Sequence, residues 1–146
     1  MNSEITVKEC QTVEELLSNL ELLKQLIPEL TEESVRASFA NQTLKRDYKV
    51  FFAVFRNKVV GLISFKSEQM LLCIDQKWAI VDEIVVDKDC RNQGIGKILL
   101  DYLCKHLKEN DYKHILVLSG DDVKQAHNFY AKYGMQKIGV FFKHDL

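Results

Sequence analysis

Residues 82–100 read DEIVVDKDCRNQGIGKILL, and this stretch decides the fold. An apolar run headed by two acids passes through a polar turn directly into a segment with helical spacing of apolar residues. The turn holds Gly94 and Gly96, and glycines at a helix start lose much chain entropy on folding, so they need a reason. A strand, a bare turn and a helix leave the first helical amides unobstructed, and such a helix start can bind phosphate. A helix that merely begins with flexible residues fits the turn alone equally well.

Two familiar phosphate-binding glycine motifs do not fit this turn. A Walker A loop places Ser or Thr directly after its lysine, whereas Lys97 is followed by Ile98. A Rossmann fingerprint needs a third small residue three positions after its second glycine, and Leu99 stands there. The sequence therefore excludes both of these nucleotide-binding motifs.

Composition limits the class of protein. With 146 residues, the chain has the size of a single domain covering residues 1–146, and folding would bury roughly two-thirds of its surface. A net charge of −1 gives no basic excess for nucleic acid or an anionic membrane. No signal peptide or membrane span is visible, so we expect a soluble cytoplasmic protein. The four cysteines lack CxxC spacing, and we expect neither a metal nor a redox site.

The periodicity of the chain predicts an α+β fold with a mostly antiparallel central sheet flanked by helices. Strands are expected at 4–10, 78–86, 114–119 and 135–142, with a hairpin over 48–66 that turns at Asn57-Lys58. Helices are expected at 12–26, 31–42, 94–108 and 123–134. Thr12 is the expected N-cap of the first helix, and Glu15 completes a capping box with it. Gly134 should end the last helix.

The helix at 94–108 has an apolar face, which should be buried. This face comprises Ile95, Ile98, Leu99, Tyr102, Leu103 and Leu107. The helix would therefore lie on the sheet with its glycine-bearing start at one edge of the core.

Two segments together resemble the signatures of the GNAT acyltransferase superfamily. Its acetyl-CoA signature, Arg/Gln-x-x-Gly-x-Gly/Ala after a strand ending in Val-Asp, is similar to the stretch in which Arg91 precedes Gly94 and Gly96. Residues 126–135, AHNFYAKYGM, resemble the second signature, Ala-x-x-Phe-Tyr-x-x-x-Gly-Phe, with Met135 in place of the final aromatic. The resemblance extends over the whole chain. Within the superfamily, it is closest in character to bacterial small-amine acetyltransferases such as aminoalkylphosphonate N-acetyltransferase.

The resemblance implies that the co-substrate is acetyl-CoA and that the bare turn receives the coenzyme A pyrophosphate. The backbone of the preceding strand would hold the pantetheine arm. The residues that would bind coenzyme A are Val85, Val86, Arg91, Asn92, Gln93, Gly94, Ile95, Gly96, Lys97 and Asn128. His127 is a further candidate for substrate contact, or else an ordinary solvent-facing helix residue.

Transfer of acetyl to an amine needs a base, because an alkyl amine with a pKa near 10.4 is only about one part in 2,500 neutral at pH 7. By its position relative to Val86 and Arg91, Glu83 matches the acid of the aminoalkylphosphonate enzyme. Asp82 is the reserve candidate. Neighbours on a strand point to opposite faces, so only one of the two should face the cleft. Alternatively, these acids cap a strand end or pair with a lysine.

The second half of the reaction releases a thiolate, which needs a proton. Tyr130 matches the tyrosine with which superfamily members protonate the coenzyme A sulfur. The alternative is a partly buried aromatic residue that only packs on the helix face. Arg36, Lys45 and Arg46 could meet an anionic substrate group, but charges on a helix face and loop are usually solvated.

Three hypotheses for function follow from the sequence. In the first, the chain moves acetyl from acetyl-CoA to the primary amine of a small molecule by direct attack. In the second, the same chemistry acts on a protein N-terminus or lysine. In the third, the chain is a non-catalytic coenzyme A-binding regulatory module, although such a module need keep neither Tyr130 nor Glu83. The apolar run VFF at 140–142 would fit either a homodimer contact or the core.

Overall fold

The computed structural model describes residues 4–43, 47–69, 76–140 and 142–146. Five strands form one sheet in the order β1-β2-β3-β4-β5. The pairs β1–β2, β2–β3 and β3–β4 are antiparallel, and β5 runs parallel to β4. The predicted α+β fold with a mostly antiparallel sheet is thus confirmed. The elements are β1 (Ile5–Glu9), α1 (Val13–Leu17), α2 (Leu20–Lys24), α3 (Glu32–Thr43), β2 (Lys49–Phe55), β3 (Lys58–Glu68), β4 (Lys77–Val86), α4 (Ile95–Glu109), β5 (Tyr112–Val117) and α5 (Lys124–Tyr133).

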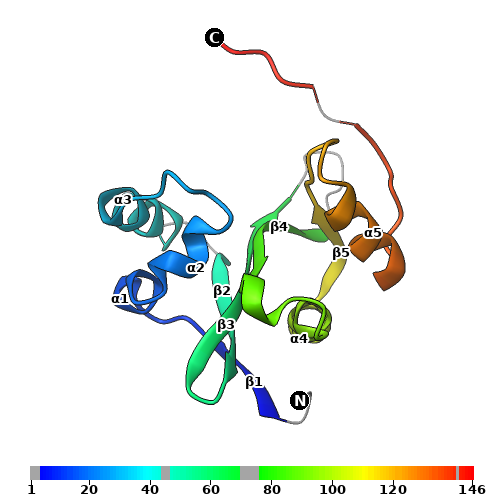
Figure 1. The fold of residues 1–146 in the computed structure, drawn as a ribbon. Coiled ribbons are helices and arrows are strands. Elements are labelled where there is room, and N and C mark those ends of the chain that lie inside the picture. The colour runs from blue at the N-terminus through cyan, green and yellow to red at the C-terminus, as the bar shows by residue number, and fades with distance from the viewer. Residues whose placement is uncertain (1–3, 44–46, 70–75, 141) are drawn as a thin grey trace.

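Helices cover both faces of the sheet (Figure 1). Strand alternation sends neighbouring residues of β3 to opposite sides, so that each face has its own apolar core. Ile63 and Phe65 pack toward α4, and Leu62 lies in the cluster with α1, α2 and α3. Residues that share a face with Leu62 therefore belong to the side covered by α1, α2 and α3. We call this side the α1–α3 face.

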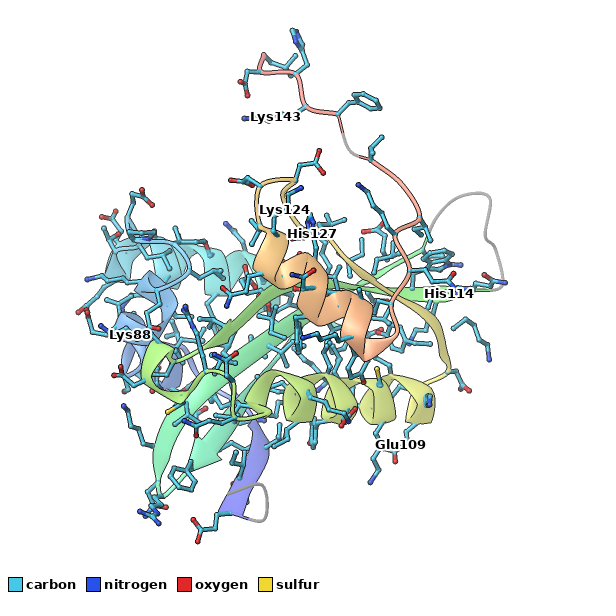
Figure 2. The ribbon with its side chains drawn as sticks, turned by 45° about the vertical axis from the view of Figure 1, so that its right-hand side comes forward. Lys88, Glu109, His114, Lys124, His127 and Lys143 are labelled. Carbon is cyan, nitrogen blue, oxygen red and sulfur yellow. The ribbon has the colours of Figure 1, made fainter. Side chains whose placement is uncertain are left out.

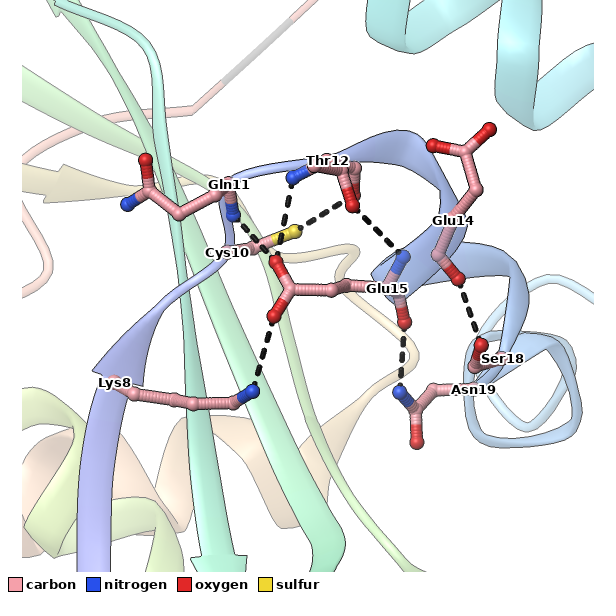
Figure 3. Close-up of polar contacts among 8 residues, drawn as sticks. All are labelled: Lys8, Cys10, Gln11, Thr12, Glu14, Glu15, Ser18 and Asn19. Atoms are coloured by element: carbon pink, nitrogen blue, oxygen red, sulfur yellow. Dashed lines mark hydrogen bonds and ion pairs between the residues drawn. The ribbon is translucent and has the colours of Figure 1, made fainter.

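The first helix begins where the sequence predicts (Figure 3). The Thr12 hydroxyl accepts the amide of Glu15 at 3.3 Å, and the Glu15 carboxylate accepts the Thr12 amide at 3.3 Å, which completes the capping box. The single helix expected over 12–26 is wrong, because α1 and α2 are separate. Ser18 donates to the Glu14 carbonyl and Asn19 to the Glu15 carbonyl, both at 2.8 Å. Such local side-chain bonds compete with the helical ladder.

The hairpin between β2 and β3 turns one residue earlier than predicted. Arg56 and Asn57 both have positive φ angles, 48° and 62°. Two consecutive positive φ angles are typical of the type I′ turn that suits a two-residue hairpin. The sequence thus located the hairpin correctly and missed its turn by one position.

The α4 helix buries the predicted face with three differences. Ile95, Leu99, Leu103 and Leu107 are buried, as is Leu100, which the sequence did not single out. Tyr102 is 37% exposed and Ile98 only partly buried. The helix lies close to β3 at Gly61. A side-chain carbon on this glycine would be only 3.2 Å from the side chains of Ile95 and Leu99. A wide contact of this kind buries adjacent positions on the helix.

The strand predicted at 135–142 is wrong. Gly134 ends α5 in the left-handed region with φ of 101°, as expected, but the described residues beyond it form neither helix nor strand. This segment leaves the body of the protein (Figure 1), and Ile138 and Val140 are 72% and 61% exposed. Strand propensity depends on a neighbouring strand, and no ladder among the described residues includes this segment.

Candidate active site

The sheet opens between β4 and β5. Their parallel pairing runs from Lys77↔Tyr112 to Val81↔Val117 and then stops. The rest of β4, from Asp82 to Val86, continues without a β5 partner. A parallel strand left unpaired on one side offers free backbone groups to a ligand. We call this part of β4 the open edge.

A β-bulge in β4 lies where the sheet opens. Ser64 of β3 pairs with Glu83 and Phe65 pairs with Val81, so Asp82 is an extra residue. A bulge bends its strand and locally breaks the alternation of side chains. The bulge therefore lies directly after the last β4 residue that pairs with β5.

The bulge also places both acids on the same face of the sheet. Ser64 and Lys66 lie two positions apart on β3 and share one side. The Glu83 carboxylate contacts the Ser64 hydroxyl, and the Asp82 carboxylate pairs with Lys66 at 3.2 Å. The expectation that Asp82 and Glu83 point to opposite faces is therefore wrong. Because Ser64 shares the side of Leu62, both acids point to the α1–α3 face.

Glu83 lies in a cluster of hydroxyl groups. The Ser64 hydroxyl donates to its carboxylate and accepts the Glu83 amide at 3.1 Å. The Tyr48 phenol lies close to Ser64 and Glu83 on the same face, and it influences the pKa of Glu83. Burial raises the pKa of Glu83, and the charge of Asp82 raises it further, whereas the bond from Ser64, the charge of Lys66 and the phenol of Tyr48 act in the opposite direction. A raised pKa makes this carboxylate a stronger base than an exposed glutamate.

The glycine turn has the conformation that a phosphate seat requires. Gly94 is the N-cap of α4 with φ of 83°, a left-handed conformation that favours glycine. Asn92 is also left-handed, with φ of 59°. The amides of Ile95, Gly96 and Lys97 belong to the first turn of a helix and have no carbonyl partner within it. These amides and the positive end of the helix dipole fit a pyrophosphate.

The packing of α5 gives a second reason for glycine at position 96. A side-chain carbon at this position would lie 3.0 Å from the Phe129 ring of α5. Gly96 therefore lets α5 pack against the start of α4. One glycine of the motif serves the backbone of the turn, and the other serves the contact between two helices.

The remaining residues of the turn are ordered by local bonds. Asp87 is buried, caps a short 3-10 helix (Lys88–Cys90) by accepting the Asp89 amide at 3.1 Å, and pairs with Lys58. Arg91 is exposed, and its Nε donates to the Val86 carbonyl at 3.1 Å. The side-chain oxygen of Gln93 is buried without a donor among the described residues. Asp101 binds Lys97 at 2.6 Å along the helix, so the Lys97 ammonium is already paired.

The open edge presents alternate residues of β4. The Asp87 amide donates to the Val60 carbonyl of β3 at 2.9 Å. Backbone groups alternate along a strand, so those of Val85 also point toward β3, and those of Ile84 and Val86 point to the open edge. The backbone direction therefore favours Ile84 and the Val86 amide, rather than Val85, for holding an extended ligand arm, because the Val86 carbonyl already accepts Arg91 Nε. Ile84 was missed because the direction of the bonds depends on the pairing with β3.

Helix α5 carries the residues of the second motif. Tyr130 is partly buried next to Phe129, with ring centroids 5.4 Å apart, and burial raises the pKa of its phenol. Asn128 is exposed, and His127 is partly buried. Figure 2 shows His127 beside Lys124 on the first turn of α5 and Lys88 in the loop that leads to α4. The phenol of Tyr130 remains protonated at neutral pH and can therefore act as an acid.

Some candidate residues have other roles or lie outside the described residues. Arg36 pairs with Glu14 of α1 at 3.1 Å and so links two helices. Lys45 and Arg46 lie outside the described residues. Ser64 and Tyr48 were missed, although a serine in the apolar run GLISF was a visible signal. Across the described ranges, no group of three or more His, Cys, Asp or Glu side chains could hold a metal, and no helix could span a membrane.

The chain matches the acetyltransferase (GNAT) family over residues 14–135. It is 25% identical over 127 residues to the uncharacterized N-acetyltransferase YhdJ of Bacillus subtilis (strain 168), which covers 87% of this chain and 88% of that protein. Among solved structures, it superposes with a TM-score of 0.83 and 16% identity on the aminoglycoside acetyltransferase meta-AAC0020 from an uncultured soil metagenomic sample, in complex with sisomicin, covering 99% of this chain and 98% of that chain. It also superposes on AAC(6')-Iy, in complex with the bisubstrate analogue CoA-S-monomethyl-acetylneamine, with a TM-score of 0.80, 13% identity, and coverage of 97% and 99%. The chain therefore belongs to the GNAT acetyltransferase family and is an acetyl-CoA-dependent N-acetyltransferase.

Proposed function

We propose that this protein transfers acetyl from acetyl-CoA to a primary amine of a small molecule, with Glu83 as the base and Tyr130 as the acid. The observation that carries the proposal is the partly buried Glu83 carboxylate with its raised pKa, directed to the α1–α3 face beside the open edge. The open edge and the start of α4 would hold acetyl-CoA. The acceptor would approach from the α1–α3 face.

Glu83 would take the proton that the acceptor must lose. For an ordinary alkyl amine, neutralisation at pH 7 costs about 4.6 kcal/mol. A neighbouring carboxylate removes this proton directly or through water. The neutral nitrogen then attacks the carbonyl carbon of the thioester, forms the C–N bond and displaces the thiolate. The second proton of the nitrogen passes to bulk water as the amide forms, and Glu83 later releases the proton it has taken to water as well.

Tyr130 would protonate the leaving thiolate. A phenol is a weaker acid than a thiol. It can still pass its proton to the thiolate while the thiolate forms in a site with little water, because the phenol does not have to ionise fully beforehand. Burial raises the pKa of Tyr130, which keeps the phenol protonated before the reaction. Bulk solvent would return the proton to Tyr130 after coenzyme A leaves.

The acceptor class is supported by the acids and by similar proteins. The charge of Asp82 is paired with Lys66, so it is Glu83 on this face that favours a cationic acceptor over an anionic one. The name of meta-AAC0020 and the analogue bound to AAC(6')-Iy both point to small molecules with amino groups. The narrower likeness to aminoalkylphosphonate N-acetyltransferase remains a prediction.

The test measures thiol release from acetyl-CoA with a panel of acceptors, and mass spectrometry identifies the products. The panel holds aminoglycosides, polyamines, amino sugars and aminoalkylphosphonates, with one peptide that has a free N-terminus and one that has an internal lysine. We expect turnover with at least one small amine and a product heavier by one acetyl group. Turnover confined to the peptides would favour the protein-acetylating alternative. Coenzyme A binding without turnover of any acceptor would favour the non-catalytic alternative.

A further inference from the structure

Ser64 lies where an apolar residue is expected. It is 1% exposed in the middle of the central strand β3, between Ile63 and Phe65. A buried hydroxyl is unfavourable unless it is hydrogen-bonded. Its hydrogen-bond partners are the carboxylate and the amide of Glu83. The serine is therefore explained by Glu83 and by nothing else in its surroundings.

Tyr48 lies close to the same carboxylate and comes from a different part of the chain. It lies immediately before β2 and packs on the α1–α3 face with Val50 and Leu62. Burial and the charge of Glu83 both raise the pKa of its phenol, so Tyr48 remains a donor at every pH at which the protein would work. The Ser64 hydroxyl on β3 and the Tyr48 phenol just before β2 thus both lie near Glu83.

We propose that Ser64 and Tyr48 are positioning residues, which hold the Glu83 carboxylate in one orientation on the α1–α3 face, where it can receive the proton of the acceptor amine. This inference rests on the proposed role of Glu83 as the base. The bulge at Asp82 is part of the arrangement, because it brings Glu83 opposite Ser64. A carboxylate that already has its donors in place needs no reorganisation when it takes a proton.

The groups around Glu83 make the direction of each substitution predictable. The bond from Ser64 and the phenol of Tyr48 stabilise the ionised carboxylate, as does the charge of Lys66, whereas burial and the charge of Asp82 oppose ionisation. Loss of either hydroxyl should raise the pKa of Glu83. Loss of the Asp82 charge should lower it, and the Lys66 ammonium that Asp82→Asn releases would act in the same direction.

The experiment has two readouts on Ser64→Ala, Tyr48→Phe and Asp82→Asn. The first is the titration of the Glu83 carboxyl carbon in the free protein, followed by NMR with ¹³C-labelled glutamate and assigned with Glu83→Gln. The second is the pH dependence of kcat/KM with the best acceptor of the panel. Ser67→Ala on the same strand and Tyr102→Phe on α4 are matched controls, because they remove the same hydroxyls away from Glu83.

We expect the titration of Glu83 and the acidic limb of kcat/KM to move together. They should move to higher pH in Ser64→Ala and Tyr48→Phe and to lower pH in Asp82→Asn, with no movement in the controls. Because a hydrogen bond to a charged group is strong, activity on the acidic limb should fall about tenfold in each hydroxyl variant and recover at higher pH. Tyr48→Phe keeps the test valid if Ser64→Ala does not fold.

Two outcomes separate the positioning role of Ser64 and Tyr48 from the role of Glu83 as the base. If folded hydroxyl variants leave the titration of Glu83 unchanged, Ser64 and Tyr48 do not position it, and the inference is overturned. If the titration moves while the pH dependence of kcat/KM does not, the cluster is supported and the role of Glu83 as the base is overturned.

Discussion

Substitutions at Gly94 can distinguish two effects: strain in the backbone of the glycine turn, and obstruction of the surface that would bind pyrophosphate. Its φ of 83° lies in the left-handed region, where a residue with a side chain costs about 1–2 kcal/mol. For a chain of about this length, that corresponds to a fall in Tm of roughly 2–8 °C. Asn accepts this conformation more readily than Ala does, so Gly94→Asn should lose less stability than Gly94→Ala. A domain of this size should tolerate both substitutions and stay folded.

The effect of Gly94→Asn on acetyl-CoA affinity should be larger than its effect on stability suggests. If pyrophosphate sits against the amides of Ile95 to Lys97, the side chain of Asn would crowd it even where the backbone is unstrained. We expect calorimetry to show acetyl-CoA affinity at least tenfold weaker in Gly94→Asn, or about 1.4 kcal/mol. Gly139→Ala is the control, because a side-chain carbon there would meet nothing within 4 Å. Undiminished affinity in folded Gly94→Asn would refute the assignment of this turn.

Three further predictions concern catalysis, local stability and pH. Tyr130→Phe should leave Tm nearly unchanged and lower turnover by roughly 10²-fold or more, with Tyr102→Phe as control, and near-full turnover would remove Tyr130 from the mechanism. Thr12→Ala should lower the free energy of unfolding by about 1 kcal/mol in urea because it removes a cap, whereas Thr12→Ser should keep it, and equal losses would contradict the capping role. Glu83→Gln should raise Tm at neutral pH, because the folded-state pKa of Glu83 is raised and its ionisation opposes folding. This gain should vanish as the pH falls below the unfolded pKa of about 4.3, and a gain that persists there would contradict the sign.

Local patterns in the sequence predicted most of the fold. The capping box at Thr12 and the left-handed end of α5 at Gly134 depend on residues within a few positions of each other, and both are confirmed. The separation of α1 from α2 at Ser18 and Asn19 also depends on local residues. The regular spacing of leucines nevertheless led to the prediction of a single helix. The strand expected at 135–142 depended on a partner strand that its own residues do not specify.

The candidate site was predicted only in part, because its geometry comes from strand pairing. Arg91 and the glycines could be located from the motif, but the packing reason for Gly96 required the position of Phe129. The bulge at Asp82 exists only in the register between β3 and β4, so alternation alone assigned the two acids to opposite faces. Ser64 gave a signal in the sequence, yet only the register shows that it faces Glu83.

The pH dependence of kcat/KM for Glu83→Gln tests the central claim most directly. The measurement compares wild type, Glu83→Gln and the exposed control Glu109→Gln with the best small amine of the panel. If Glu83 accepts the amine proton, the loss in Glu83→Gln should be largest near neutral pH. It should shrink as the pH approaches about 10, where the amine loses its proton unaided. A loss of constant size at every pH, with a higher KM for the amine and an unchanged kcat, would contradict the claim and make Glu83 an anchor for a cationic substrate.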